Sequence, residues 1–154
     1  MPYWRLLYHL VWATAGREPT LVDEPASTVH RVIRQLGVEH GVDILAIGNV
    51  PDHIHVVASI PPKHAVADVV KLLKGRSSYA ASHDEKGSRT SNFAWQSEYG
   101  VLSFGEQALP DVVAYVNNQW NHHARKDTWR KLEQMTSERP NSLATTSPER
   151  TSPS

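Results

Sequence analysis

Two strand-like runs joined by a turn signal lie in the middle of the chain and restrict its fold more than any other segment. The runs are VDILAIGNV and HIHVVASI, with the dipeptide Pro51-Asp52 between them. Both are rich in β-branched and apolar residues, and a turn dipeptide between two such runs is typical of an antiparallel hairpin. The rest of the chain must therefore pack around this antiparallel pair.

Segments on both sides of the hairpin alternate between strand-like and helical periodicity. The apolar run from Tyr3 to Trp12 predicts a buried strand, and residues 93–104 predict another, with a bulge or turn at Gly100. Apolar residues at helical spacing predict amphipathic helices at 27–41 and 64–82, and a further helix is expected to run from Leu109 to His123. Residues 15–26, which contain Gly and Pro, are expected to be largely loop.

The resulting order, β-α-β-β-α-β followed by a helix, predicts an α+β fold of the ferredoxin-like type, with an antiparallel sheet and helices packed against one face. The additional C-terminal helix carries Tyr115. The length of 154 residues allows one domain, to which we assign residues 1–131. Residues 132–154 are rich in Ser, Thr and Pro and are expected to form a disordered tail.

Composition excludes several functional classes. The chain has no Cys, which excludes disulfide frameworks, thiolate nucleophiles and Cys-based zinc or iron–sulfur sites. Sixteen Lys+Arg balance sixteen Asp+Glu, so the formal net charge is zero and any basic surface must be local. No apolar run is long enough to span a membrane and no signal sequence is visible, so we expect a soluble cytoplasmic protein.

His53 and His55 stand at the start of the second run of the hairpin. Because side chains alternate along a strand, both imidazoles are expected on one face, and Ile54 and Val56 on the opposite, apolar face. Two imidazoles on one face can bind a divalent metal ion, although a lone His-x-His is more often a half-solvated pair of histidines. A third donor is needed to decide between these alternatives.

The last helix can supply that donor. Tyr115 and Gln119 are one turn apart on a polar stripe that includes His122, separate from an apolar stripe through Val112 and Val116. A metal ion held by two imidazoles and an amide oxygen would polarise a phosphodiester, and Tyr115 would be placed as a nucleophile toward phosphorus. The alternative is that the tyrosine is an ordinary surface or interface residue.

Positively charged residues gather in two places despite the neutral net charge. Lys71, Lys74, Arg76 and Ser77 lie in the second helix, and Arg125 follows the last one. Their ammonium, guanidinium and hydroxyl groups are suited to phosphate oxygens, so we predict that they contact DNA. The alternative is a solvated helix face.

Several of these segments occur together, in the same order, in a known family. The chain resembles the single-tyrosine HUH-type (TnpA-like) transposases of bacterial insertion sequences, which are relatives of the REP-associated tyrosine transposases. The matching motifs are Tyr8-His9-Leu10-Val11-Trp12, Gly48-Asn49-Val50-Pro51-Asp52-His53-Ile54-His55, Leu72-Leu73-Lys74-Gly75-Arg76-Ser77-Ser78, Trp95-Gln96 with Tyr99-Gly100, and Tyr115-Val116-Asn117-Asn118-Gln119 with His122-His123.

The resemblance implies a metal-dependent transposase that nicks and rejoins single-stranded DNA and so moves an insertion sequence. His53, His55 and Gln119 would bind Mg²⁺ or Mn²⁺, and Tyr115 would attack the scissile phosphate to form a 5′-phosphotyrosine. The resemblance also implies a homodimer and recognition of DNA hairpins near the ends of the element. Two alternatives stay open: a non-catalytic or domesticated single-strand nucleic-acid binding protein, and a metal-dependent phosphodiesterase that uses water and forms no protein adduct.

Overall fold

The computed structural model describes residues 2–119 and 129–136. Its centre is a four-stranded antiparallel sheet in the spatial order β2-β3-β1-β4. The elements in chain order are β1 (Leu7–Ala13), the short 3₁₀ helix η1 (Ala15–Arg17), α1 (Asp23–His40), β2 (Asp43–Val50), β3 (His53–Ser59), α2 (Val66–Ser82), β4 (Gly100–Phe104), the 3₁₀ helix η2 (Glu106–Ala108), α3 (Leu109–Asn117) and α5 (Arg130–Glu133). The expected β-α-β-β-α-β order and antiparallel sheet are confirmed.

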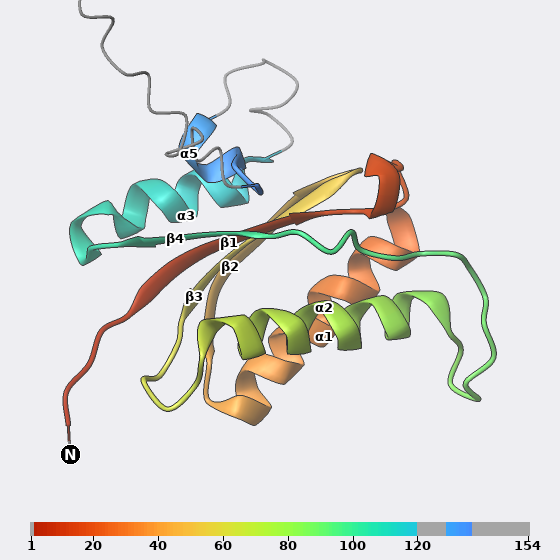
Figure 1. Cartoon of the computed structure of the whole chain (residues 1–154), viewed down its shortest axis with the longest axis horizontal. Coiled ribbons are helices and arrows are strands. Elements are labelled where there is room, and N and C mark those ends of the chain that lie inside the picture. The colour runs from red at the N-terminus through yellow and green to blue at the C-terminus, as the bar shows by residue number, and fades with distance from the viewer. Residues whose placement is uncertain (1, 120–128, 137–154) are drawn as a thin grey trace, which may run out of the picture.

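Helices cover both faces of the sheet (Figure 1). α1 and α2 pack together beneath one face, while α3 and α5 lie on the opposite face. The two helices within the β-α-β-β-α-β unit therefore share one face, as expected for a ferredoxin-like fold. The additional helix does not join them, and it closes the face that the other two leave open.

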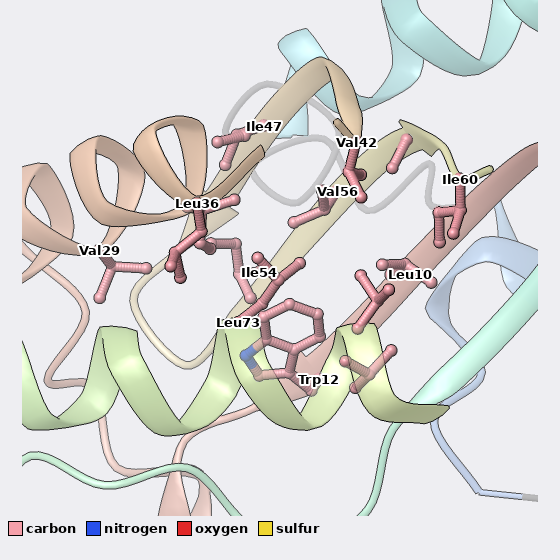
Figure 2. Close-up of a cluster of buried hydrophobic side chains, with 14 of the residues drawn as sticks. Leu10, Trp12, Val29, Leu36, Val42, Ile47, Ile54, Val56, Ile60 and Leu73 are labelled. Carbon is pink, nitrogen blue, oxygen red and sulfur yellow. The ribbon is translucent and has the colours of Figure 1, made fainter. Parts of the chain in front are cut away.

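The main hydrophobic core lies between the sheet and the α1/α2 layer (Figure 2). Ile54 and Val56 of β3 and Leu10 and Trp12 of β1 alternate with residues that point to the other face, so each strand contributes every second side chain to this core. All four side chains are less than 1% exposed. The alternation that predicted an apolar face for Ile54 and Val56 is confirmed.

Some element boundaries differ from the sequence predictions. α1 begins at Asp23 rather than near residue 27. Pro25 falls in its first turn, where backbone N–H groups have no acceptor within the helix, so a proline is tolerated there. β1 begins at Leu7, and Tyr3 is 87% exposed. Residues 93–99 run alongside the sheet with only an isolated bridge from Trp95 to Thr14, and the regular strand begins at Gly100.

Residues 129–136, here called the C-terminal segment, pack on the α3 face of the sheet. Leu132 is fully buried and Met135 contacts Val11 and Ala13 of β1. Residues 132–136, at the start of the expected tail, thus lie against the sheet, where these two apolar side chains are buried. The remainder of that tail, residues 137–154, lies outside the described residues.

Two glycines allow backbone to approach this face closely. Gly48 of β2 pairs with His55 of β3, and a Cβ atom at Gly48 would overlap the carbonyl oxygen of Val116 in α3. Gly100 of β4 pairs with Val11, and a Cβ atom there would overlap the carbonyl oxygen of Gln134. Each overlap is with backbone, so rotation of a side chain cannot relieve it.

We expect Gly48→Ala to destabilise the protein by about 2–3 kcal/mol, because α3 must move away from β2 to make room for the methyl group. Gly75→Ala is the matched control: Gly75 lies inside α2 with open space around the position of its Cβ, and alanine there should stabilise by about 0.5–1 kcal/mol. Urea unfolding measures both changes. Equal stability of Gly48→Ala and the wild-type protein would contradict the close approach of α3.

Candidate functional site

His53 and His55 lie on the face of β3 that α3 and the C-terminal segment cover. Both are buried, at 1% and 0% exposure, so the alternative of a half-solvated histidine pair is wrong. Their ring centroids are 5.1 Å apart. The placement of both imidazoles on one face, which the alternating pattern predicts, is confirmed.

Asp52 orients the first of these imidazoles. His53 Nδ1 lies 2.7 Å from Asp52 Oδ1, and Arg17 Nε donates to Asp52 Oδ2 at 3.2 Å. Partial burial works against ionisation of Asp52, but the hydrogen bond and charge of His53, together with the charge of Arg17, hold the pKa of this carboxyl below its ordinary value. A carboxylate that accepts from Nδ1–H leaves Nε2 of His53 directed into the site, the arrangement found for metal-binding histidines.

His9 of β1 orients the second imidazole. Its Nε2 lies 2.7 Å from Nδ1 of His55, and His9 is itself only 1% exposed. Burial first, and then the neighbouring His55, lowers the pKa of His9 to about 3, so its imidazole is neutral at physiological pH. A neutral His9 can accept the Nδ1–H of His55, which leaves Nε2 of His55 for a ligand.

Glu133 of α5 brings a carboxylate to the two imidazoles. Its Oε2 lies 2.9 Å from His53 Nε2, and its Oε1 lies 3.2 Å from His55 Nε2. Burial opposes ionisation, but hydrogen bonds from His53 and His55 hold the pKa of Glu133 far below its ordinary value. The ligand atoms of these three residues lie within 4.8 Å of one another, so this group could hold a metal ion.

Gln119 adds an unsatisfied acceptor beside Gly48, the β2 residue that pairs with His55. Its side chain is 1% exposed, and its Nε2 donates to the carbonyl oxygen of Tyr115 at 3.1 Å. Its Oε1 is buried and has no hydrogen-bond partner among the described residues. Because an orphaned buried carbonyl oxygen costs free energy, and a cation can satisfy it, the donor set of two imidazoles and an amide oxygen fits a divalent ion.

Tyr115 faces the histidines from α3. Its ring centroid is 6.0 Å from that of His55, its Oη donates to Glu133 Oε1 at 2.6 Å, and the backbone N–H of Trp129 donates to its Oη at 2.7 Å. Burial first, and then the hydrogen bond to Glu133, raises the pKa of Tyr115 above its ordinary value, so the phenol is neutral. A neutral phenol is a weak nucleophile until a nearby group or the substrate activates it.

The predicted division of α3 into separate polar and apolar stripes needs correction. Tyr115 is 6% exposed and lies with Val112 and Val116 in one buried cluster, because Glu133 and the Trp129 N–H satisfy its hydroxyl inside the protein. The helix is also shorter than expected, since α3 ends at Asn117. Trp120, His122 and His123 lie outside the described residues.

The residues predicted to contact DNA divide into two groups. Lys71 and Arg76 are exposed on α2. Lys74 instead donates to the carbonyl oxygens of residues 96, 97 and 98 at 2.7–3.2 Å, which ties α2 to the segment before β4. Ser77 is fully buried and accepts a hydrogen bond from Trp95 Nε1 at 3.0 Å, so its hydroxyl faces the interior of the protein in this structure. Arg125 lies outside the described residues.

Three residues of the site were not singled out from the sequence. His9 could have been found, because period-2 alternation places it on the face opposite Leu10 and Trp12. Asp52 could also have been found, since metal-binding histidines commonly donate to a carboxylate. For Glu133 there was no signal, because the residues around it show no sustained periodicity.

Within the part of the chain that the structure describes, no helix has both the length and the apolar character needed to cross a membrane.

Comparisons with known proteins agree on one family. The family model described as "Transposase IS200 like" matches residues 2–119. The chain is 29% identical over 119 residues to the ISDra2 transposase TnpA of Deinococcus radiodurans, covering 75% of this chain and 85% of that protein. It is 30% identical over 119 residues to the transposase for insertion sequence element IS200 of Salmonella typhimurium, covering 75% and 78%.

Solved structures show the same fold. The crystal structure of a candidate transposase from Deinococcus radiodurans superposes with a TM-score of 0.59 at 29% identity, covering 77% of this chain and 93% of that chain. The structure of a REP-associated tyrosine transposase bound to a REP hairpin superposes with a TM-score of 0.61 at 14% identity, covering 80% and 72%. The second likeness concerns the fold alone.

Acid should destabilise the protein partly through His9. Its folded pKa of about 3 is below the unfolded value of 6.5, so between these values the unfolded chain binds a proton that the folded chain does not, and stability falls as pH falls. Between pH 7 and pH 5 this contributes a loss of about 2 kcal/mol. The charges of His55 and Glu133 also act on His9. Both residues are unchanged in every variant compared, so they do not account for a difference between the variants.

Urea unfolding at both pH values checks this expectation. His9→Gln keeps an acceptor for His55 without titrating, so it should lose less stability between pH 7 and pH 5 than the wild-type protein. His40→Gln, at the exposed end of α1, should keep the wild-type loss. An unchanged pH dependence in His9→Gln would contradict a neutral, buried His9.

Proposed function

Because the chain belongs to the IS200-like transposase family, we propose that it nicks and rejoins single-stranded DNA through a 5′-phosphotyrosine at Tyr115, with the help of a divalent metal ion. The observation that carries this proposal is that Tyr115 faces two buried imidazoles on one side of the sheet, with a buried, unsatisfied amide oxygen on Gln119 beside Gly48, the residue that pairs with His55. The activity would move an insertion sequence.

His53, His55 and Gln119 would hold Mg²⁺ or Mn²⁺. When bound, such an ion polarises the scissile phosphate and offsets the negative charge that develops on it. Asp52 and His9 orient the two imidazoles, since each accepts at the Nδ1 side and so directs Nε2 toward the proposed metal site. Burial of all three proposed ligands excludes water that would weaken these interactions.

Tyr115 is the nucleophile. Its Oη forms a bond to phosphorus while the bond from phosphorus to the 3′ oxygen breaks, and the departing 3′ oxygen ends as a hydroxyl carrying the proton that Tyr115 loses. The product is a 5′-phosphotyrosine, in which the energy of the phosphodiester is retained. A 3′-hydroxyl can therefore attack this ester and rejoin the strand without a nucleotide cofactor.

The partner is single-stranded DNA with hairpins at the ends of the element, bound in the cytoplasm by a homodimer. The REP hairpin in the structure of the REP-associated transposase supports a hairpin ligand. Lys71 and Arg76 of α2 are exposed and offer positive charge to phosphates, and Arg125 is proposed as a further contact. Lys71 also borders a groove of about 550 Å³ whose wall includes Trp95 and Tyr99.

A non-catalytic, single-strand nucleic-acid binding protein is the second candidate. The hydrogen bonds that Glu133 and the Trp129 N–H make to Tyr115 favour it, because in this arrangement the hydroxyl is held by the protein itself. The two candidates differ in one product, a covalent bond between protein and DNA.

Tyr115→Phe should abolish the covalent adduct and leave DNA binding within about two-fold, because it removes only the nucleophilic oxygen. The assay incubates the purified chain with labelled oligonucleotides from both flanks of its gene, in Mg²⁺ or Mn²⁺, and looks for an SDS-resistant protein–DNA band. Tyr79→Phe, at an exposed tyrosine of α2, is the matched control and should keep the band. DNA binding without a band in the wild-type protein would favour the binding-protein function.

His55→Ala should reduce adduct formation by a factor of about 10² or more, because a proposed metal ligand is lost. A chelator should do the same to the wild-type protein, and added Mn²⁺ should restore it. His40→Ala, outside the site, should react like the wild-type protein. Full adduct formation in chelator would contradict the metal-dependent mechanism and leave the nucleophile assignment intact.

A further inference from the structure

We propose that Glu133 is a ligand of the divalent metal ion, so that the C-terminal segment and the ion bind to the sheet cooperatively. This inference rests on the proposed metal site at His53 and His55, to which it adds a residue from outside the matched family region, residues 2–119. It also gives residues 129–136 a function in metal binding.

The positions of the three donors fit a shared ion. The Glu133 carboxylate oxygens lie 2.9 and 3.2 Å from the Nε2 atoms of His53 and His55. Two neighbouring ligands of one ion, with bonds of about 2.1 Å, are separated by about 3 Å, so each of these spacings is one that two ligands of a single ion can have. The ligand atoms of all three residues lie within 4.8 Å of one another. Little movement of the protein is needed to place an ion against all three residues.

Charge also favours a carboxylate in this set. Two imidazoles and an amide oxygen provide no anionic ligand, while Mg²⁺ and Mn²⁺ are hard cations that prefer oxygen donors and are costly to bury without a counter-charge. Glu133 supplies one negative charge, and its side chain is only 17% exposed. Among the described residues, the group that could hold a metal ion consists of His53, His55 and Glu133. Glu133 is the member of this group that provides a carboxylate when no DNA phosphate is bound.

The backbone around Glu133 is held in place independently of the carboxylate. Leu132 is fully buried beside α3, Met135 packs on Val11, and the Gln134 carbonyl fits against Gly100 only because that position has no Cβ. These contacts fix the segment on both sides of Glu133. The carboxylate is therefore presented to the imidazoles by packing, as a ligand on a preorganised support.

Cooperative binding has a reciprocal consequence. If docking of the segment strengthens metal binding, then metal binding must strengthen docking of the segment by the same factor. The opposite arrangement, in which Glu133 blocks the site and the ion must displace it, predicts the opposite sign for both effects. Whether Glu133→Gln raises or lowers the Kd for the metal ion therefore distinguishes the two arrangements.

The primary experiment measures the Kd for Mn²⁺ of the full chain without DNA, by calorimetry and by the electron paramagnetic resonance spectrum of the bound ion. Glu133→Gln, which keeps the shape of the side chain, should weaken binding by about 10- to 100-fold. Glu106→Gln is the matched control, because Glu106 is an exposed acid paired with Arg5, and its Kd should stay within two-fold of the wild-type value.

A second variant displaces the segment without changing any proposed ligand. In Gly100→Ala the new methyl group would overlap the Gln134 carbonyl, so the segment should detach and the Kd for Mn²⁺ should rise as in Glu133→Gln. Hydrogen exchange of residues 129–136 gives a readout independent of affinity. Mn²⁺ should slow exchange there in the wild-type protein and leave it unchanged in Glu133→Gln.

The outcomes separate this inference from the metal site on which it rests. If the wild-type protein binds Mn²⁺, His55→Ala abolishes binding and Glu133→Gln binds as tightly as the wild type or more tightly, then Glu133 is not a ligand and the metal site stands. Faster exchange of residues 129–136 on adding Mn²⁺ would likewise overturn the proposal. If the wild-type protein binds no Mn²⁺, or His55→Ala binds equally well, the proposed metal site itself fails.

Discussion

The site depends on one transverse row of the sheet, in which Gly48, His55, Val11 and Gly100 lie side by side on four adjacent strands. Paired residues in an antiparallel sheet point to the same face, so both glycines leave room on the face that carries His55. At one end of the row the backbone of α3 approaches, and at the other end the backbone of the C-terminal segment approaches. The absence of two side chains therefore lets two separate parts of the chain, α3 and the C-terminal segment, pack closely on the face that carries His55.

Burying so many polar groups on this face requires each to have a partner. Asp52 and His9 are the hydrogen-bond partners of the Nδ1 atoms of His53 and His55. Glu133 contacts the Nε2 atoms of both histidines and accepts a hydrogen bond from the Tyr115 hydroxyl. Such a network is stable only when it is complete, because an unpaired buried polar group costs more than a hydrogen bond contributes. The Gln119 Oε1 atom is a buried acceptor on this face for which the described residues provide no hydrogen-bond partner, and its side chain lies beside Gly48, the β2 residue that pairs with His55.

Local periodicity was sufficient to predict the ferredoxin-like order and the common face of His53 and His55, because both follow from alternation within single strands. Long-range contacts were not accessible in this way. Ser77 was assigned to the charged group of α2, but its hydroxyl is buried and accepts a hydrogen bond from Trp95 in the segment before β4. Glu133 belongs to a segment without periodicity, and its place in the site follows from the fit of Leu132, Met135 and Gly100.

The two faces of the sheet differ in what they bury: one buries an apolar core and the other buries ionisable groups. The α1/α2 face buries a continuous apolar core, which accounts for the stability of the fold. The opposite face holds ionisable groups whose pKa values are displaced in opposite directions, with Glu133 held ionised and Tyr115 held neutral. Because α3 and the C-terminal segment pack on this face through contacts that require Gly48 and Gly100, the positions of the chemical groups depend on the packing of these two elements. Assembly of the site is thus controlled by peripheral packing, and the core provides the rigid platform on which it occurs.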